Sequence, residues 1–232
     1  MGNPAAGNPL AGHRQRLRQR FLRGGIAALN DYEVLELILS GAIPRRDVKP
    51  IAKSLIERFG SFEAVLDASG SELLDEPGLG PAGTVALLLI RQTCVRYLEQ
   101  QVRKTDLLAS PKQISDYLRM KLGGGKKETL MVLYLDARRQ LIASETYPGT
   151  VDHATIYRRE VLETALKTRA SGVILAHNHP SGICEPSSSD LVLTREIGHV
   201  LREIRVDLFD HYVVTPAACR SIFFIDDCKE KK

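Results

Sequence analysis

Several residue types that would place the chain in a special class of protein are scarce or missing. The 232 residues include no tryptophan, and aromatic side chains make up 6% of the sequence. No apolar run approaches the roughly 18 residues that a membrane span requires, and the first 30 residues lack the apolar core of a signal peptide. The four cysteines have no Cys-x-x-Cys spacing and are expected to be free thiols; they are Cys94, Cys184, Cys219 and Cys228. We therefore expect a cytoplasmic protein that does not bind a membrane.

Acidic residues are absent from the first 30 positions, which hold five arginines: Arg14, Arg16, Arg18, Arg20 and Arg23. The rest of the chain carries nearly equal numbers of basic and acidic residues, so the net charge of +4 originates in this amino-terminal arm. Arginines without acidic neighbours indicate contact with a polyanion such as nucleic acid, or with an acidic protein surface. A solvated helix face would give the same pattern, and the sequence does not separate these explanations.

The amino-terminal half shows the apolar spacing of helices, separated by glycine-containing breaks. We expect a disordered tail at residues 1–12, a helical domain at 13–103 and a linker at 104–112. Residues 73–87 resemble a helix–hairpin–helix motif, with Gly78-Leu79-Gly80 as the hairpin. Glycines there let backbone N–H groups approach a phosphate at the start of the second helix. The hairpin lacks the usual basic residue, and Thr84 replaces the usual alanine, so the motif either contacts DNA or only packs two helices together.

The carboxy-terminal half mixes strand patterns with helix patterns. The expected elements are a helix at 111–120, strands at 129–136 and 141–147, a helix at 156–169, a strand at 172–176, a helix from Asp190, and strands at 212–215 and 221–225. The first two strands follow one another across a short turn, as in a hairpin. This mixture predicts an α+β fold built on one central sheet.

Two histidines and an aspartate follow the strand at 172–176 within a short distance. His177 and His179 lie two residues apart, so strand geometry places both imidazoles on one face. Asp190 comes after a loop of proline, serine and glycine and opens the next helix. Three protein ligands leave a fourth position open, which is the arrangement of a catalytic zinc site with one Zn²⁺ per chain. Cys184 lies in the same loop, but these three residues already complete the protein's share of the ligands.

The aspartate also has a purely structural explanation. Ser187-x-x-Asp190 in front of an apolar helix is the pattern of a capping box, with Ser187 as the N-cap. The complete combination, His-x-His-x7-Ser-x2-Asp, nevertheless matches the JAMM signature of the JAB/MPN metallohydrolases.

The resemblance extends to the RadC family of bacterial JAB-domain proteins over nearly the whole chain. The stretches that carry it are Tyr32-Glu33-Val34-Leu35, Pro77-Gly78-Leu79-Gly80, Pro148-Gly149-Thr150, Arg159-Glu160-Val161, the His177-Asn178-His179-Pro180-Ser181-Gly182 motif, and Asp210-His211-Tyr212. The resemblance implies a JAB/MPN domain at residues 113–228, with a central mixed sheet of the cytidine-deaminase-like kind. It also implies hydrolysis of peptide or isopeptide bonds. Asn178 stands where eukaryotic deubiquitinases carry serine or threonine, which argues against ubiquitin-type substrates.

The resemblance further implies the catalytic roles. The general base of JAMM enzymes is a glutamate at the start of the first core strand, a place that Glu128 occupies here, with Glu145 as the second candidate. Ser187 would donate a hydrogen bond to the developing oxyanion. Glu160 and Glu163 are expected to face solvent. The spacing of the remaining histidines does not require any of them as ligands; these are His153, His199 and His211.

Two functions follow. The first is a zinc metallopeptidase or isopeptidase that acts on a peptide or protein substrate. The second is a DNA-associated protein, either a repair-linked nuclease or a DNA-binding module whose metal is structural, with contacts through the Arg14–Arg23 arm and the Gly78–Gly80 hairpin.

Overall fold

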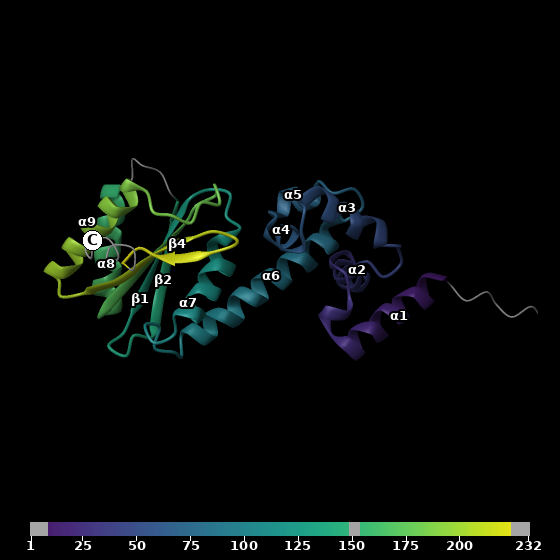
Figure 1. Ribbon diagram of the computed structural model, residues 1–232, viewed down its shortest axis with the longest axis horizontal. Coiled ribbons are helices and arrows are strands. Elements are labelled where there is room, and N and C mark those ends of the chain that lie inside the picture. Colours follow the sequence, from purple (N-terminus) through teal and green to yellow (C-terminus); the bar gives the residue numbers. More distant parts are fainter. Residues whose placement is uncertain (1–8, 149–153, 224–232) are drawn as a thin grey trace, which may run out of the picture. The chain divides into compact units, whose positions relative to one another are not determined.

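A computed structural model of the protein describes residues 9–148 and 154–223 (Figure 1). The chain forms two compact units, residues 1–93 and residues 94–232. His153, Cys228 and the first eight residues of the expected tail lie outside the described residues. Helix α1 begins at Pro9, inside the segment 1–12 that was expected to be a tail. A proline suits this position, since the first turn of a helix has no use for its missing N–H.

The first unit is helical. Its elements are α1 (Pro9–Gly24), η1 (Ile26–Ala28), α2 (Asp31–Ala42), α3 (Lys49–Phe59), α4 (Phe62–Asp67), α5 (Gly70–Leu74) and the beginning of α6 (Gly80–Val102). Asn30 caps α2 in a capping box with Glu33, and α3 packs along α2. Leu35, Leu39 and Leu55 are fully buried between these helices, so apolar packing is the main source of their stability.

Polar contacts attach α1 to the rest of the first unit. The Arg14 guanidinium donates hydrogen bonds to the carbonyl oxygens of Pro44 and Arg46. Arg20 donates to both carboxylate oxygens of Glu33, at 2.6 and 3.0 Å. Two arginines of the basic arm are therefore bonded within the unit. The other three have exposed side chains, namely Arg16, Arg18 and Arg23.

The second unit begins inside α6. The predicted boundary at the 104–112 linker differs from this division, because Leu107 is fully buried in the core of the second unit together with Val95 and Val102. No glycine or proline interrupts the sequence from residue 84 to residue 102, so nothing in the chain ends the helix between the two units.

A mixed sheet of five strands forms the centre of the second unit (Figure 1). The strands are β1 (Thr129–Leu135), β2 (Leu141–Pro148), β3 (Gly172–Asn178), β4 (Asp207–Val214) and β5 (Cys219–Ser221). Their order across the sheet is β2-β1-β3-β4-β5, and only the β3–β4 pair is parallel. A helical first unit followed by this sheet and its helices confirms the α+β prediction.

Helices cover both faces of the sheet. One face packs on α7 (Pro111–Leu118) and on the end of α6, and a short π-helix, η2 (Arg119–Gly123), follows α7. The other face packs on α8 (Ala154–Thr168) and α9 (Ser188–Glu203). Side chains alternate along each strand, so Met131 and Leu133 face the first layer whereas Leu130 and Val132 face the second.

The later strands differ from their predicted ranges. β4 starts at Asp207 and not at residue 212, and β5 is Cys219–Ser221 where a strand at 221–225 was expected. Polar residues inside β4 hid its first half from the sequence pattern. Asp210 is buried in this strand. Its carboxylate accepts hydrogen bonds from the Ser221 hydroxyl and the His211 amide, both at 2.7 Å, which offset the cost of burial.

No helix within residues 9–148 and 154–223 has both the length and the apolar character needed to cross a bilayer.

Candidate metal centre

The two histidines of the motif lie at the carboxyl end of β3. This strand is buried along its whole length, between β1 and β4. Every second side chain of β3 points to the face of the sheet that α9 covers. These side chains are Val173, Leu175 and His177, so the His177 ring leaves the sheet on that face. His179 follows the strand directly, and its backbone N–H donates to the carbonyl of Val214 at 2.9 Å. The rigid centre of the sheet therefore fixes both backbones.

Asp190 reaches the same place from the first turn of α9. Ser187 is the N-cap of this helix, and the capping box predicted from the sequence is present: the Ser187 hydroxyl accepts from the Asp190 amide, while the Ser187 amide donates to the Asp190 carboxylate at 2.7 Å. The Ser187 hydroxyl also lies 2.6 Å from the same carboxylate oxygen, Oδ2. The cap thus orients the aspartate toward the histidines.

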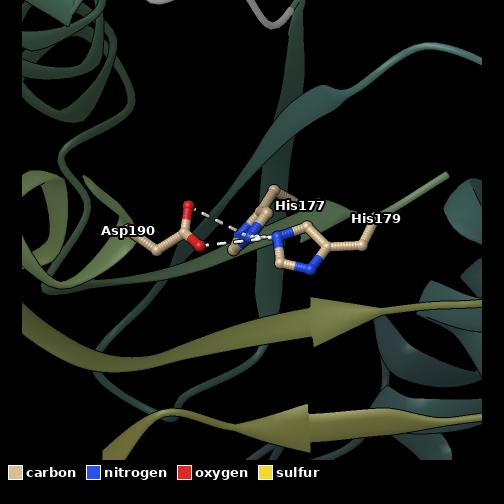
Figure 2. Close-up of side chains that lie close together, drawn as sticks. All are labelled: His177, His179 and Asp190. Carbon is tan, nitrogen blue, oxygen red and sulfur yellow. Dashed lines mark hydrogen bonds and ion pairs between the residues drawn. The ribbon is translucent and has the colours of Figure 1, made fainter. Parts of the chain in front are cut away.

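The three side chains converge (Figure 2). The two Nε2 atoms of His177 and His179 are 2.9 Å apart. Asp190 Oδ1 is 3.2 Å from His177 Nε2, and Oδ2 is 3.4 Å from His179 Nε2. Nitrogen and oxygen ligands at about 2.0–2.2 Å in a tetrahedron around Zn²⁺ would be separated by about 3.3–3.5 Å. The three residues could therefore hold a metal ion with little movement, as their grouping within 4.8 Å indicates.

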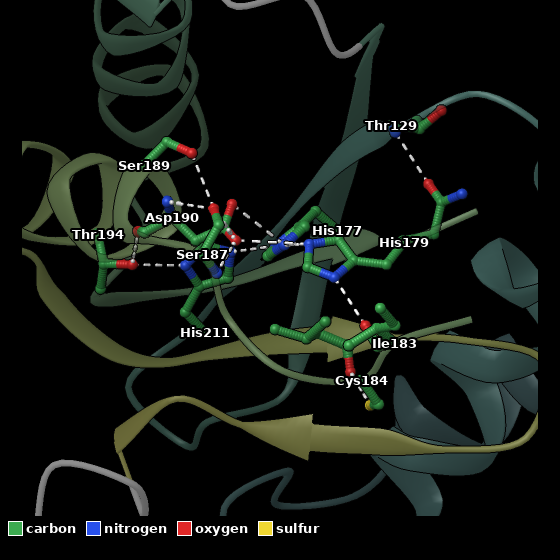
Figure 3. Close-up of polar contacts among 12 residues, drawn as sticks. Thr129, His177, His179, Ile183, Cys184, Ser187, Ser189, Asp190, Thr194 and His211 are labelled. Carbon is green, nitrogen blue, oxygen red and sulfur yellow. Dashed lines mark hydrogen bonds and ion pairs between the residues drawn. The ribbon is translucent and has the colours of Figure 1, made fainter. Parts of the chain in front are cut away.

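Hydrogen bonds fix which nitrogen of each ring carries its hydrogen (Figure 3). The Thr194 hydroxyl donates to the carbonyl of Asp190 at 2.6 Å, so it accepts from Nδ1–H of His211, also at 2.6 Å. Nε2 of His211 must then accept from Nδ1–H of His177, 2.8 Å away. Nδ1–H of His179 donates to the carbonyl of Ile183 at 2.8 Å. In the neutral rings both Nε2 atoms keep their lone pairs, which is the state that binds a metal.

Two pKa shifts describe the charges of the site. Burial lowers the pKa of His211 to about 3, and the neighbouring His177 adds to the effect, so His211 is neutral at pH 7. Burial alone would raise the pKa of Asp190, but its contacts with His177 and Ser187 outweigh burial and lower it well below the usual range. The hydrogen that His177 gives to this carboxylate lies where a metal ion would bind. A proton and a divalent metal therefore compete for the same atoms.

Cys184 contacts the end of β4 and not the cluster. Its thiol donates to the carbonyl of Val213 at 3.3 Å. Burial raises the pKa of this thiol, which disfavours the thiolate form that binds metals. His199 is exposed on α9.

The two candidate bases have different surroundings. Glu128 is exposed and directly precedes β1. Leu130 pairs with His177, so continuing this antiparallel register by two residues places Glu128 opposite His179 and on the His177 face. Glu145 lies on β2, and its carboxylate accepts from the hydroxyls of Tyr134, Tyr147 and Thr164. Three hydroxyl donors favour a structural role for Glu145, and the catalytic role of Glu128 stays a prediction.

Comparison with known proteins agrees with the fold and the cluster. Residues 108–226 match the model of the RadC-like JAB domain, and residues 11–85 match that of the UPF0758 N-terminal region. A UPF0758 protein of Ruegeria pomeroyi is 41% identical over 203 residues, covering 87% of this chain and 91% of the relative. The chain belongs to the RadC-like JAB family. UPF0758 proteins of Paraburkholderia xenovorans and Chromobacterium violaceum are each 40% identical to this RadC-like JAB chain, over 85% and 87% of it and over 78% and 90% of their own lengths.

Membership in the RadC-like JAB family and the convergence of His177, His179 and Asp190 support the resemblance on which the metal prediction rested. The sequence did not require His211 as a ligand and gave Thr194 no role. The signal that could have singled out His211 is a histidine beside an aspartate in an otherwise apolar strand. Its link to His177 depends on the pairing of β3 with β4, which no local pattern reveals.

Proposed function

We propose that the protein is a zinc-dependent metallohydrolase that cleaves peptide or isopeptide bonds. The observation that carries the proposal is the convergence of two histidine Nε2 atoms and one carboxylate, whose side chains are each held by further hydrogen bonds. Structural zinc sites usually have four protein ligands, whereas catalytic sites keep one position for water or substrate. Three protein ligands that are 9–15% exposed, and so reachable from solvent, fit the second kind.

Each residue has a chemical task in this proposal. His177, His179 and Asp190 would hold the ion, which when bound supplies Lewis-acid polarisation of the scissile carbonyl and of water. Glu128 would accept a proton from the attacking water and then deliver it to the leaving nitrogen. Ser187 would donate its hydroxyl hydrogen to the carbonyl oxygen where negative charge develops. The role as N-cap of α9 uses only a lone pair of this hydroxyl, whereas the proposed task needs its hydrogen to turn from Asp190 Oδ2, 2.6 Å away, to the substrate.

The first test is the metal content of the purified protein, measured beside the His177→Ala and Asp190→Ala variants. We expect about one zinc per chain in the wild type and a loss of zinc in both variants. Cys184→Ala is the matched control and should keep the metal. A wild-type protein that takes up no metal, even after reconstitution, would contradict the proposal.

The second test separates hydrolysis from metal binding. Glu128→Gln should keep the zinc, while cleavage of a peptide library that includes isopeptide-linked lysines, followed by mass spectrometry, should slow by about 10²–10⁴-fold. The corresponding Glu145→Gln variant should retain most of the activity. Equal activity of Glu128→Gln and the wild type would remove Glu128 from the mechanism.

A second candidate function is contact with DNA by the first unit. A cleft of about 490 Å³ lies beside the Gly78–Gly80 hairpin at the start of α6, and Arg45 and Arg46 line it. Basic side chains beside a helix amino terminus suit a phosphate. If DNA binds there, affinity for a duplex should fall with added salt, and Arg45→Ala should reduce that salt dependence. Salt-independent or undetectable binding would leave the hairpin with a packing role alone.

A further inference from the structure

Asn178, the residue between the two histidines, is buried and fully hydrogen bonded. It is the last residue of β3 and is 1% exposed. Its side-chain oxygen accepts from the backbone N–H of Thr129 at 2.8 Å. Its side-chain nitrogen donates to the carbonyl oxygens of Gly125 and Lys127, at 2.9 and 3.0 Å. One side-chain amide thus bonds to the backbone of every second residue from Gly125 to Thr129, the segment that leads into β1.

The bound segment is the one that carries Glu128. Residues 125–128 are exposed and belong to a glycine-rich connection, so by themselves they would be mobile. The bonds to Lys127 and Thr129 fix the backbone on both sides of Glu128. Because side chains alternate, Asn178 lies on the opposite face of the sheet from His177, and its amide can hold the segment without entering the metal centre.

Gly125 is matched to this contact. A Cβ atom at position 125 would lie 2.9 Å from the Asn178 side-chain nitrogen and 3.0 Å from the carbonyl oxygen of Leu122. The first distance is shorter than real Cβ contacts show, and the second is tighter than nine in ten of them. A side chain there would therefore push the segment away from Asn178, so glycine at 125 and asparagine at 178 form one unit.

We infer that Asn178 is a positioning residue, which holds the 125–129 segment so that Glu128 stays beside the metal centre. The role of Glu128 as base rests on the proposed function, whereas the anchoring of the segment does not. A base held in place before the substrate arrives loses less entropy in the reaction, and a displacement of about 1 Å can cost about 10²-fold in rate. Asparagine suits the position because its amide supplies one acceptor and two donors, all of which are used here.

Three variants of the full chain test this inference. Asn178→Ala removes all three bonds, and Gly125→Ala disturbs the same contact from the side of the loop. Lys127→Ala is the matched control, since Lys127 contributes its backbone carbonyl and its side chain is exposed. The readouts are zinc affinity, the pseudocontact shifts that bound Co²⁺ induces at the backbone amides of Glu128 and Thr194, and the kinetics of peptide cleavage.

In Asn178→Ala and Gly125→Ala we expect zinc affinity and the Co²⁺-induced shift of the Thr194 amide to be retained. The Co²⁺-induced shift of the Glu128 amide should be lost, because it is averaged over the positions of a mobile 125–129 segment. We expect kcat to fall by about 10²-fold, with KM nearly unchanged. Neither substitution should slow the Glu128→Gln variant further, because the group being positioned is already missing. Lys127→Ala should behave as the wild type.

An unchanged Glu128 shift in a zinc-binding Asn178→Ala protein would overturn the inference. So would a loss of zinc in that variant, because Asn178 would then support the ligands and not the segment. If Asn178→Ala does not fold, Gly125→Ala decides the question alone. If the wild type cleaves nothing, the hydrolase proposal fails, and the Co²⁺-induced shifts still decide whether Asn178 positions Glu128.

Discussion

At the scale of single residues, the metal centre is controlled by groups that do not touch the metal position. The neutral His177 ring presents its Nε2 lone pair because its Nδ1–H donates to Nε2 of His211. Nε2 of His211 can accept because His211 donates its own Nδ1–H to the Thr194 hydroxyl. A hydroxyl on α9 therefore sets the state of a ring on β3. Partners of this kind typically change metal affinity by about 10–100-fold when removed.

Thr194→Val tests this chain of hydrogen bonds. We expect zinc to bind about tenfold more weakly, as measured by competition with a chromogenic chelator, because His211 is no longer held with its hydrogen on Nδ1. Thr168→Val is the matched control: its hydroxyl also donates to a carbonyl one helical turn earlier, but on α8. Equal zinc affinity of Thr194→Val and Thr168→Val would show that the ring state does not depend on Thr194.

The sequence identified the three converging residues because they lie on one short stretch, within residues 177–190, where spacing alone carries the information. The hydrogen-bond partners could not be found in this way. His211 reaches His177 only through the parallel pairing of β3 with β4, and Asn178 reaches Thr129 only through the pairing of β1 with β3. Local patterns show which residues alternate along a strand, but they do not show which strands are neighbours.

At the scale of elements, α1 is attached to α2 by ion pairs that involve buried acids. Glu33 is 6% exposed, and the hydrogen bond from Arg20 lowers the pKa of its carboxyl. In the sequence the arginines of this segment look alike, as a polyanion-binding arm or a solvated face. The structure separates them, because Arg14 and Arg20 have partners in the same unit. Contacts between residues distant in the sequence thus distinguish arginines that composition alone treats as equal.

The lowered pKa of Glu33 predicts a pH dependence. A carboxyl whose pKa is lower in the folded state stabilises the fold above its unfolded pKa, about 4.3, and loses this effect as the pH falls below it. Arg20→Ala should therefore lower the free energy of unfolding at pH 7, and the difference from the wild type should shrink as the pH falls below about 4. Urea unfolding of both proteins at pH 7 and at pH 3 measures this difference in the free energy of unfolding.

Arg18→Ala, which removes an exposed arginine from the same helix, is the control and should change stability little at either pH. An Arg20→Ala effect of the same size at pH 7 and at pH 3 would indicate that Arg20 acts through packing of its aliphatic part and not through the charge of Glu33.

At the scale of the whole molecule, the two units are built from different parts of the sequence but share α6. The α+β character and the order of strands and helices were predictable, since each element has its own period. The position of the division between the two units was not predictable. The loop at 104–110 has the composition of a linker, yet Leu107 is fully buried in the core of the second unit, and only the three-dimensional packing reveals this.

Metal binding should act on the second unit. Zinc at about 100 times its dissociation constant should stabilise the site by about 2.7 kcal/mol. Amide hydrogen exchange should therefore slow in β3 and in the first turns of α9, while amides of α2 and α3 keep their rates. The His177→Ala variant, measured with and without zinc, is the control. Equal protection of α2 and β3 would contradict a site that belongs to one unit.

The short distance along the chain between the metal-facing residues has a mechanical consequence. An ion that joins His177 on β3 to Asp190 on α9 closes a ring of backbone, as a disulfide would. For a ring of roughly 15 residues such a cross-link removes about 3 kcal/mol of unfolded-chain entropy. The cysteines that the structure describes are free thiols. Coordination would therefore give this segment a reversible cross-link, and the supply of metal would determine how often it is formed.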